Sequence, residues 1–175
     1  MKLRTIINIL ALIIIGVLQS NYPVVLEMGY GGIKPNFLLI YIIVYSLLNG
    51  SYEGAMIGFT AGFVQDLLTG KVIGIYALIG MLFGMAIGWS NKKIYKENFI
   101  VASLVIFIGT IVYELVIAAT LGIQLFHQNN MLYALKFIVF PEALYNSIIS
   151  IGVYWVIGLI NKRTDKLLIK ETINK

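Results

Sequence analysis

Cysteine is absent from the sequence, which excludes disulfides and thiolate chemistry and leaves the redox compartment open. Charge is also scarce. Only 12% of the 175 residues are charged and 59% are hydrophobic, whereas a soluble domain has about 25% charged and about 45–50% apolar residues. A chain of this size cannot hide that much apolar surface inside a globule. The composition therefore predicts a protein that folds in lipid.

The uncharged runs are long enough to cross a bilayer, which takes roughly 20 apolar residues, with a range of about 17–25. The first run is too long for a cleaved signal peptide and lacks a small-x-small site, so we expect it to remain as a helix. The pattern predicts an all-α, polytopic membrane protein, with six transmembrane helices in one bundle, a single domain over 1–175 and a cytoplasmic tail over 162–175. The predicted helices are at about 5–26, 35–50, 52–69, 72–91, 98–124 and 141–161.

The basic residues give the expected orientation. The formal net charge is +5, and in membrane proteins Lys and Arg collect in cytoplasmic loops, so the excess does not indicate a nucleic-acid partner. With the N-terminus inside, three of the 13 Lys and Arg residues lie outside, namely Lys34, Lys71 and Lys136. We therefore expect both termini in the cytoplasm. The inside residues are Lys2, Arg4, Lys92, Lys93, Lys96, Lys162, Arg163, Lys166, Lys170 and Lys175.

Two segments leave alternatives open. Residues 131–140 are compatible with an interfacial helix, and Pro141 either begins or kinks the sixth helix. The tail carries Leu167, Leu168 and Ile173 beside lysines. This pattern fits either a short basic helix attracted to anionic lipid or a frayed, solvated end.

Glycine repeats at every fourth position in two neighbouring predicted helices. Glycines four residues apart lie on one ridge, and such ridges let helix backbones approach closely in lipid, where close packing replaces a hydrophobic driving force. The link TGKVIG between the two helices is short, so we expect the ridges to pack against each other. The ridge residues are Gly54, Gly58 and Gly62 in the third helix and Gly80, Gly84 and Gly88 in the fourth.

Asp66 stands where the four-residue repeat would place another glycine, in the last turn before Gly70, which has the character of a C-cap. The helix dipole there disfavours a negative charge, and a charge in the membrane is costly unless it is paired or hydrated. Lys71 and Lys34 are the cations expected on the same side. We interpret Asp66 as a structural or partner-binding residue paired with a nearby cation; contact with a substrate or ion and simple solvation are the alternatives.

Two helix starts are recognisable. Pro35, followed by Asn36, suits the first position of the second helix because its missing N–H needs no partner there. Glu53 follows Ser51, a good N-cap, in a first turn where the helix dipole favours an anion. Both features need no chemistry beyond capping.

Three classes of function compete. An enzyme needs convergent acids, bases, nucleophiles or ligands, yet the single histidine, His127, lies in a predicted outside loop and no acidic pair or metal spacing lies in the spans. We therefore expect no enzyme, no cofactor and no metal site. A small-molecule or lipid carrier needs polar groups that converge near the midplane, and the candidates are scattered. They are Asn8, Gln19, Thr60, Gln65 and Glu114. The third class is a membrane scaffold.

The stretch from Lys34 to Asn98 resembles the family of the rod shape-determining membrane protein MreD. The family pattern has Pro-Asp or Pro-Asn opening a helix, a Gly-x-x-x-Gly-x-x-x-Gly helix closing with Asp-x-x-x-Gly, and a short link into a glycine-rich helix that ends in basic residues. Asn36 stands where aspartate is common, which weakens any need for a charge there. The matching residues are Pro35, Asn36, Glu53, Gly54, Gly58, Gly62, Asp66, Gly70, Gly74, Tyr76 and Gly80.

The resemblance implies a scaffold of the bacterial cell-elongation machinery in the inner or plasma membrane, with no catalytic residues to carry over. Such a protein binds MreC and acts with MreB, RodA and a class B penicillin-binding protein in lateral peptidoglycan synthesis and rod shape. The family also looks like the six-helix substrate-binding subunits of energy-coupling-factor (ECF) transporters. A small-molecule or lipid carrier of that type is therefore the alternative, although a shared fold says little about a ligand.

Overall fold

The structure is a computed structural model, and it describes residues 2–21, 33–69, 72–90, 99–121 and 131–173. Every regular element within these ranges is a helix, so the all-α prediction is confirmed for the described residues. The elements are α1 (Lys2–Ser20), α2 (Phe37–Asn49), α3 (Ser51–Thr69), α4 (Ile75–Trp89), α5 (Phe99–Leu121), α6 (Met131–Ala134), the π-helix η4 (Leu135–Val139) and α7 (Phe140–Ile173).

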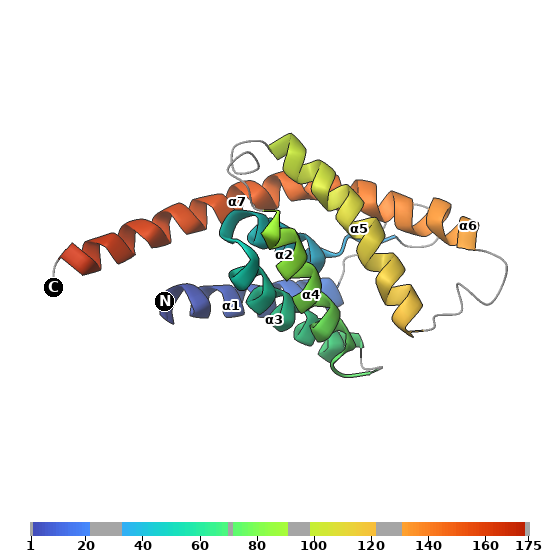
Figure 1. The fold of residues 1–175 in the computed structure, drawn as a ribbon, viewed down its shortest axis with the longest axis horizontal. Helices are drawn as coiled ribbons and strands as arrows, with labels where there is room; N and C mark the ends of the chain where they lie inside the picture. The colour runs from blue at the N-terminus through green and yellow to red at the C-terminus, as the bar shows by residue number, and fades with distance from the viewer. Residues whose placement is uncertain (1, 22–32, 70–71, 91–98, 122–130, 174–175) are drawn as a thin grey trace.

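The helix α2 lies at the centre of the fold. Every residue from Leu38 to Leu47 is buried, because α2 is apolar around its whole circumference and such a helix must be covered on all sides. It contacts α1, α3, α4, α5 and α7. Its 13 residues reach only about 20 Å at 1.5 Å per residue. Because α2 contacts five helices, protein covers most of the surface of α2, and the outer helices face the surroundings (Figure 1).

Hydrogen bonds at both ends of α1 give the directions of the first three helices. At one end Tyr45 of α2 joins Asn8 of α1 (2.7 Å) to Glu53 of α3 (2.7 Å). At the other end Gln19 of α1 accepts from the second N–H of α2 (3.1 Å) and donates to Gln65 of α3 (3.2 Å). α1 therefore runs antiparallel to α2 and parallel to α3.

The helices α5 and α7 cover another side of α2 and run antiparallel to each other (Figure 1). The hydroxyl oxygens of Ser103 and Ser147 lie 2.6 Å apart. Further along α5, the ring of Phe107 meets that of Phe140, which lies earlier in α7, edge to face at 5.5 Å. These contacts join the two helices into one pair.

The helix α7 runs in the same direction as α2. Near the start of both helices the N–H of Asn36 donates to the side-chain oxygen of Asn146 (2.9 Å), and near the end of α2 the side chain of Asn161 donates to that of Asn49 (3.2 Å). Directions thus alternate along the chain: α1, α3 and α5 run one way, and α2, α4 and α7 run the other.

The end of the chain forms one continuous helical stretch from Met131 to Ile173. A proline inside a helix lacks an N–H and its ring clashes with an earlier carbonyl. The π turn lies just before Pro141, and in it the N–H of Phe140 bonds to the carbonyl of Leu135. This wider turn accommodates the proline. Residues 131–140 are therefore continuous with the last long helix, and Pro141 does not begin it.

The tail is helical as far as Ile173, because α7 continues beyond residue 161 without a break. Figure 1 shows this extension projecting past the rest of the bundle. Of the two alternatives for the tail, the helical one matches the backbone.

Two stretches within the described residues are long and apolar enough to cross a membrane, Ile100–Leu121 and Leu135–Asn161. Shorter apolar stretches occur at Ile7–Ser20, Phe37–Asn49 and Ile75–Trp89. These are five stretches of unequal length, and the third expected span, α3, is in neither group. The number of crossings therefore stays a prediction.

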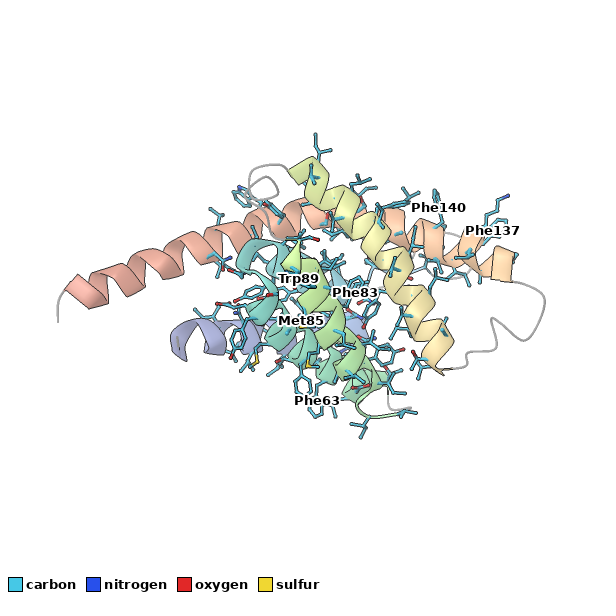
Figure 2. The ribbon with its side chains drawn as sticks, in the orientation of Figure 1. Phe63, Phe83, Met85, Trp89, Phe137 and Phe140 are labelled. Atoms are coloured by element: carbon cyan, nitrogen blue, oxygen red, sulfur yellow. The ribbon has the colours of Figure 1, made fainter. Side chains whose placement is uncertain are left out.

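Large apolar side chains point outward from the bundle. Met85 and Trp89 on α4 and Phe137 on η4, all labelled in Figure 2, are exposed, and Trp89 is 85% exposed. Phe63 on α3 is also exposed. A soluble monomer rarely exposes apolar surface on this scale, and lipid is the solvent that such an outer surface fits.

Candidate functional site: the glycine seam and its carboxylate cap

The two glycine ridges lie directly against each other and form what we call the glycine seam: Gly54, Gly58, Gly62, Gly80, Gly84 and Gly88. A methyl group added at Gly58 would overlap the carbonyl of Gly80, and one added at Gly80 would overlap the carbonyl of Gly58. Gly54 and Gly84 oppose each other in the same way. The two helices therefore run antiparallel with their backbones in contact.

The ends of the seam are equally close. A methyl group at Gly62 would overlap the carbonyl of Tyr76, and one at Gly88 would lie 2.5 Å from the carbonyl carbon of Gly50. Gly50 separates α2 from α3 with a φ of 96°, a region that favours glycine. The helix α3 starts at Ser51 itself, so the residue before it is Gly50, and the N-cap role expected for Ser51 does not apply.

Asp66 caps the start of α4. Its carboxylate accepts three backbone N–H groups, from Gly74 and Ala77 through one oxygen and from Tyr76 through the other, each at 3.0 Å. The side chain is 1% exposed. The first N–H groups of a helix have no partner within the helix, and the N-terminal end of the helix dipole favours an anion. A carboxylate from the neighbouring helix meets both needs.

This geometry explains why a buried carboxylate is tolerated at the unfavourable end of its own helix. The positive end of α4 faces Asp66 and offsets the negative end of α3. Gly74 makes the approach possible, since its φ of 104° lies in the left-handed region. The expected cation, Lys71, and the expected C-cap, Gly70, lie outside the described residues, and Lys34 is exposed before α2.

Asn36, rather than Pro35, caps the start of α2. The helix begins at Phe37, and the side chain of Asn36 accepts the N–H of Leu39 at 3.0 Å. Asparagine is among the strongest N-cap residues, which places Pro35 one residue before the cap instead of at the first helical position. Glu53 lies in the first turn of α3 as expected and accepts the hydroxyl of Tyr45.

Of the polar residues considered for a carrier, Gln19, Gln65 and Glu114 lie near the start of α2, whereas Asn8 and Thr60 bond elsewhere. Asn8 bonds to Tyr41 and Tyr45 of α2, and Thr60 bonds to the carbonyl of Met56 in its own helix. A cleft of about 460 Å³ lies elsewhere, between α5 and α7, with a mostly apolar lining that includes Ser103. Within the described residues no group of three or more His, Cys, Asp or Glu side chains could hold a metal ion.

Reasoning from the sequence missed Asn146, a fully buried residue on α7 that bonds to the backbone of Asn36 and to the hydroxyl of Thr110. An uncharged amide inside an apolar run gave no periodic signal. The carboxyl of Glu114 lies beside the side chain of Asn36, at the same junction.

These features define a class: a helical membrane protein whose buried polar groups join helices to one another. The chain belongs to the MreD family, because the model of the rod shape-determining protein MreD matches residues 2–163. The resemblance seen in the sequence is thereby confirmed. Comparison with curated proteins and with solved structures gives no match. Membership supports a role in rod shape determination in a bacterial membrane, and the family is one of shape-determining components and not a known enzyme family.

Proposed function

We propose that this protein is a membrane scaffold of the cell-elongation machinery that binds MreC directly. The carrying observation is the family match over residues 2–163. The chemistry of the site supports a scaffold, because the buried carboxylate beside the seam, that of Asp66, is used in a contact between helices. MreB, RodA and a class B penicillin-binding protein would belong to the same complex and direct lateral peptidoglycan synthesis.

The proposed membrane arrangement is a single six-span bundle with both termini in the cytoplasm, like the substrate-binding subunits of ECF transporters. The alternating helix directions support it, since successive spans of a multi-pass chain must run in opposite directions. The short helices α2 and α4 fit as spans that are partly or wholly covered by longer neighbours.

The test is purification of the tagged chain from its own membranes, with the co-purifying proteins identified. We expect MreC in the purified complex, at an amount that falls for Asp66→Asn at matched expression and stays level for Thr60→Val. Thr60 lies on the same helix and bonds only to its own helix among the described contacts. Recovery of an ATP-driven transporter module without MreC would instead support the ECF-type carrier.

A further inference from the structure

The apolar surface of α2 does not by itself fix the position of α7 along it. Hydroxyls of the buried part of α2 bond to α1, to α3 or within α2: Tyr41 donates to Asn8, Tyr45 to Glu53, and Ser46 to the carbonyl of Ile42. Apolar contact is non-directional. A shift of α7 by one turn, about 5.4 Å, would therefore exchange one set of apolar contacts for another.

Polar contacts between the two helices occur at both ends of α2. At its start the N–H of Asn36 donates to the side-chain oxygen of Asn146 (2.9 Å), and at its end Asn161 donates to Asn49 (3.2 Å). Thirteen positions separate the N-cap Asn36 from Asn49, and fifteen separate the two asparagines of α7, or about 20 and 22 Å along the helices. The spacings match, so both pairs form together in one register.

The bond between Asn36 and Asn146 cannot be broken without leaving a polar group unpaired. Asn146 is 0% exposed, and its amide nitrogen donates to the hydroxyl of Thr110 on α5 at 3.3 Å. After a shift of one turn this amide would face apolar side chains of α2. A buried polar group without a partner is strongly unfavourable.

Two carboxyls join the same junction. The carboxyl of Glu114 on α5 lies beside the side chain of Asn36, and that of Glu142, one turn earlier on α7, lies beside Asn146. One acidic residue of α5 and one of α7 therefore lie near the start of α2.

We propose that the pairs Asn36–Asn146 and Asn49–Asn161 form a register key that holds α7 at one position along α2. Single buried asparagines fix helix register in coiled coils in the same way. The key also sets how far the helical extension 162–173 projects beyond the bundle. This inference does not depend on which partners the protein binds.

Cross-linking in the naturally cysteine-free chain tests the register. Asn49→Cys with Asn161→Cys reports the native register, and Asn49→Cys with Ile157→Cys reports a shift of one turn. Both reporters replace Asn49 and so remove the Asn49–Asn161 bond. The register then depends on Asn146. In membranes treated with a mild oxidant, we expect the first pair to cross-link and the second to cross-link only weakly.

The decisive comparison adds Asn146→Leu to both reporters. We expect native cross-linking to fall several-fold and the shifted cross-link to rise several-fold. Ser150→Ala is the matched control, because Ser150 is equally buried on α7 but bonds to the carbonyl of Ser147 in its own helix. That variant should leave both reporters unchanged.

Asn146→Ser serves in place of the leucine variant if the latter does not accumulate in the membrane. Unchanged, exclusive cross-linking of the native pair in either Asn146 variant would overturn the proposal. So would failure of both variants to accumulate while Ser150→Ala does, because Asn146 would then be needed for folding rather than for register.

Discussion

At the scale of single residues, Asp66 shows how a side chain on one helix can complete another. The negative end of α3 and the positive end of α4 act on the carboxylate with opposite sign, each by about 0.3–1 kcal/mol or somewhat more when buried. The two dipole contributions therefore largely cancel. The three hydrogen bonds to backbone N–H groups decide the balance, since bonds to a charged group contribute about 1.5–3 kcal/mol each.

We predict that Asp66→Asn destabilises the protein by about 1.5–3 kcal/mol. An amide offers one acceptor oxygen, and its NH₂ group would face a backbone N–H that has lost its partner. Thermal unfolding in detergent, followed through the fluorescence of the two tryptophans, measures the effect. The control Thr60→Val should unfold near the wild-type temperature. Equal midpoints for wild type and Asp66→Asn would show that the cap contributes little.

The sequence located Asp66 as a residue whose charge must be offset, but it did not show what offsets it. The charge of nearby lysines suggested an ion pair. The N–H groups of Gly74, Tyr76 and Ala77 became partners only because the link after α3 folds back and turns the start of α4 towards the carboxylate. Residue types do not show which backbone N–H groups will meet a side chain, so such a partner can be identified only once the fold is known.

At the scale of elements, the glycine seam determines how α3 and α4 meet. The repeat in the sequence predicted that two ridges would approach, and the opposed glycines do so. Apolar runs between turn residues also led to expected helices at 35–50, 52–69 and 98–124, and α2, α3 and α5 lie at 37–49, 51–69 and 99–121. The sequence did not predict one helical stretch from Met131 to Ile173, because a π turn before Pro141 depends on local packing.

We predict opposite effects for alanine at two helical glycines. Gly58→Ala would place a methyl group on the carbonyl of Gly80, a backbone atom that moves only if the helices separate, so we expect a loss of about 1–3 kcal/mol. Gly152→Ala meets no atom within 4 Å and removes a helical glycine, so it should stabilise by up to about 0.5–1 kcal/mol.

Thermal midpoints of the two variants and of wild type in the same detergent give the comparison. Gly84→Ala should behave like Gly58→Ala, because Gly84 opposes the carbonyl of Gly54. Gly16→Ala should cost less, since its new methyl group meets mainly the side chain of Val64, which can adjust. A midpoint for Gly58→Ala equal to that of Gly152→Ala would contradict the assignment of the seam.

At the scale of the whole molecule, the hydrogen bonds connect elements far apart in the sequence. Asn36 bonds to Asn146 and Asn49 bonds to Asn161, so the last helix packs along the second. Composition predicted a membrane bundle but gave no order of neighbours. The order depends on which polar groups find partners once the apolar faces have packed, and the sequence alone does not rank those pairings.

The alternating helix directions lead to the last prediction, which concerns the sides of the membrane. The helix α4 lies between Ile73 and Ser90, both of which are exposed, and its 15 residues span about 22 Å. With both termini in the cytoplasm, Ile73 lies outside and Ser90 inside. Because the chain has no cysteine, Ile73→Cys and Ser90→Cys each introduce a single thiol.

In intact cells stripped of any outer barrier, a membrane-impermeant maleimide should label Ile73→Cys and should label Ser90→Cys only after the membrane is opened. Fusions of a cytoplasmic reporter to either terminus should be active, because the basic residues of both ends favour the inside. Labelling of both thiols from outside would mean that α4 does not cross the membrane. A C-terminal reporter that is active only outside would overturn the six-span arrangement, since an even number of crossings must return the chain to the side on which it began.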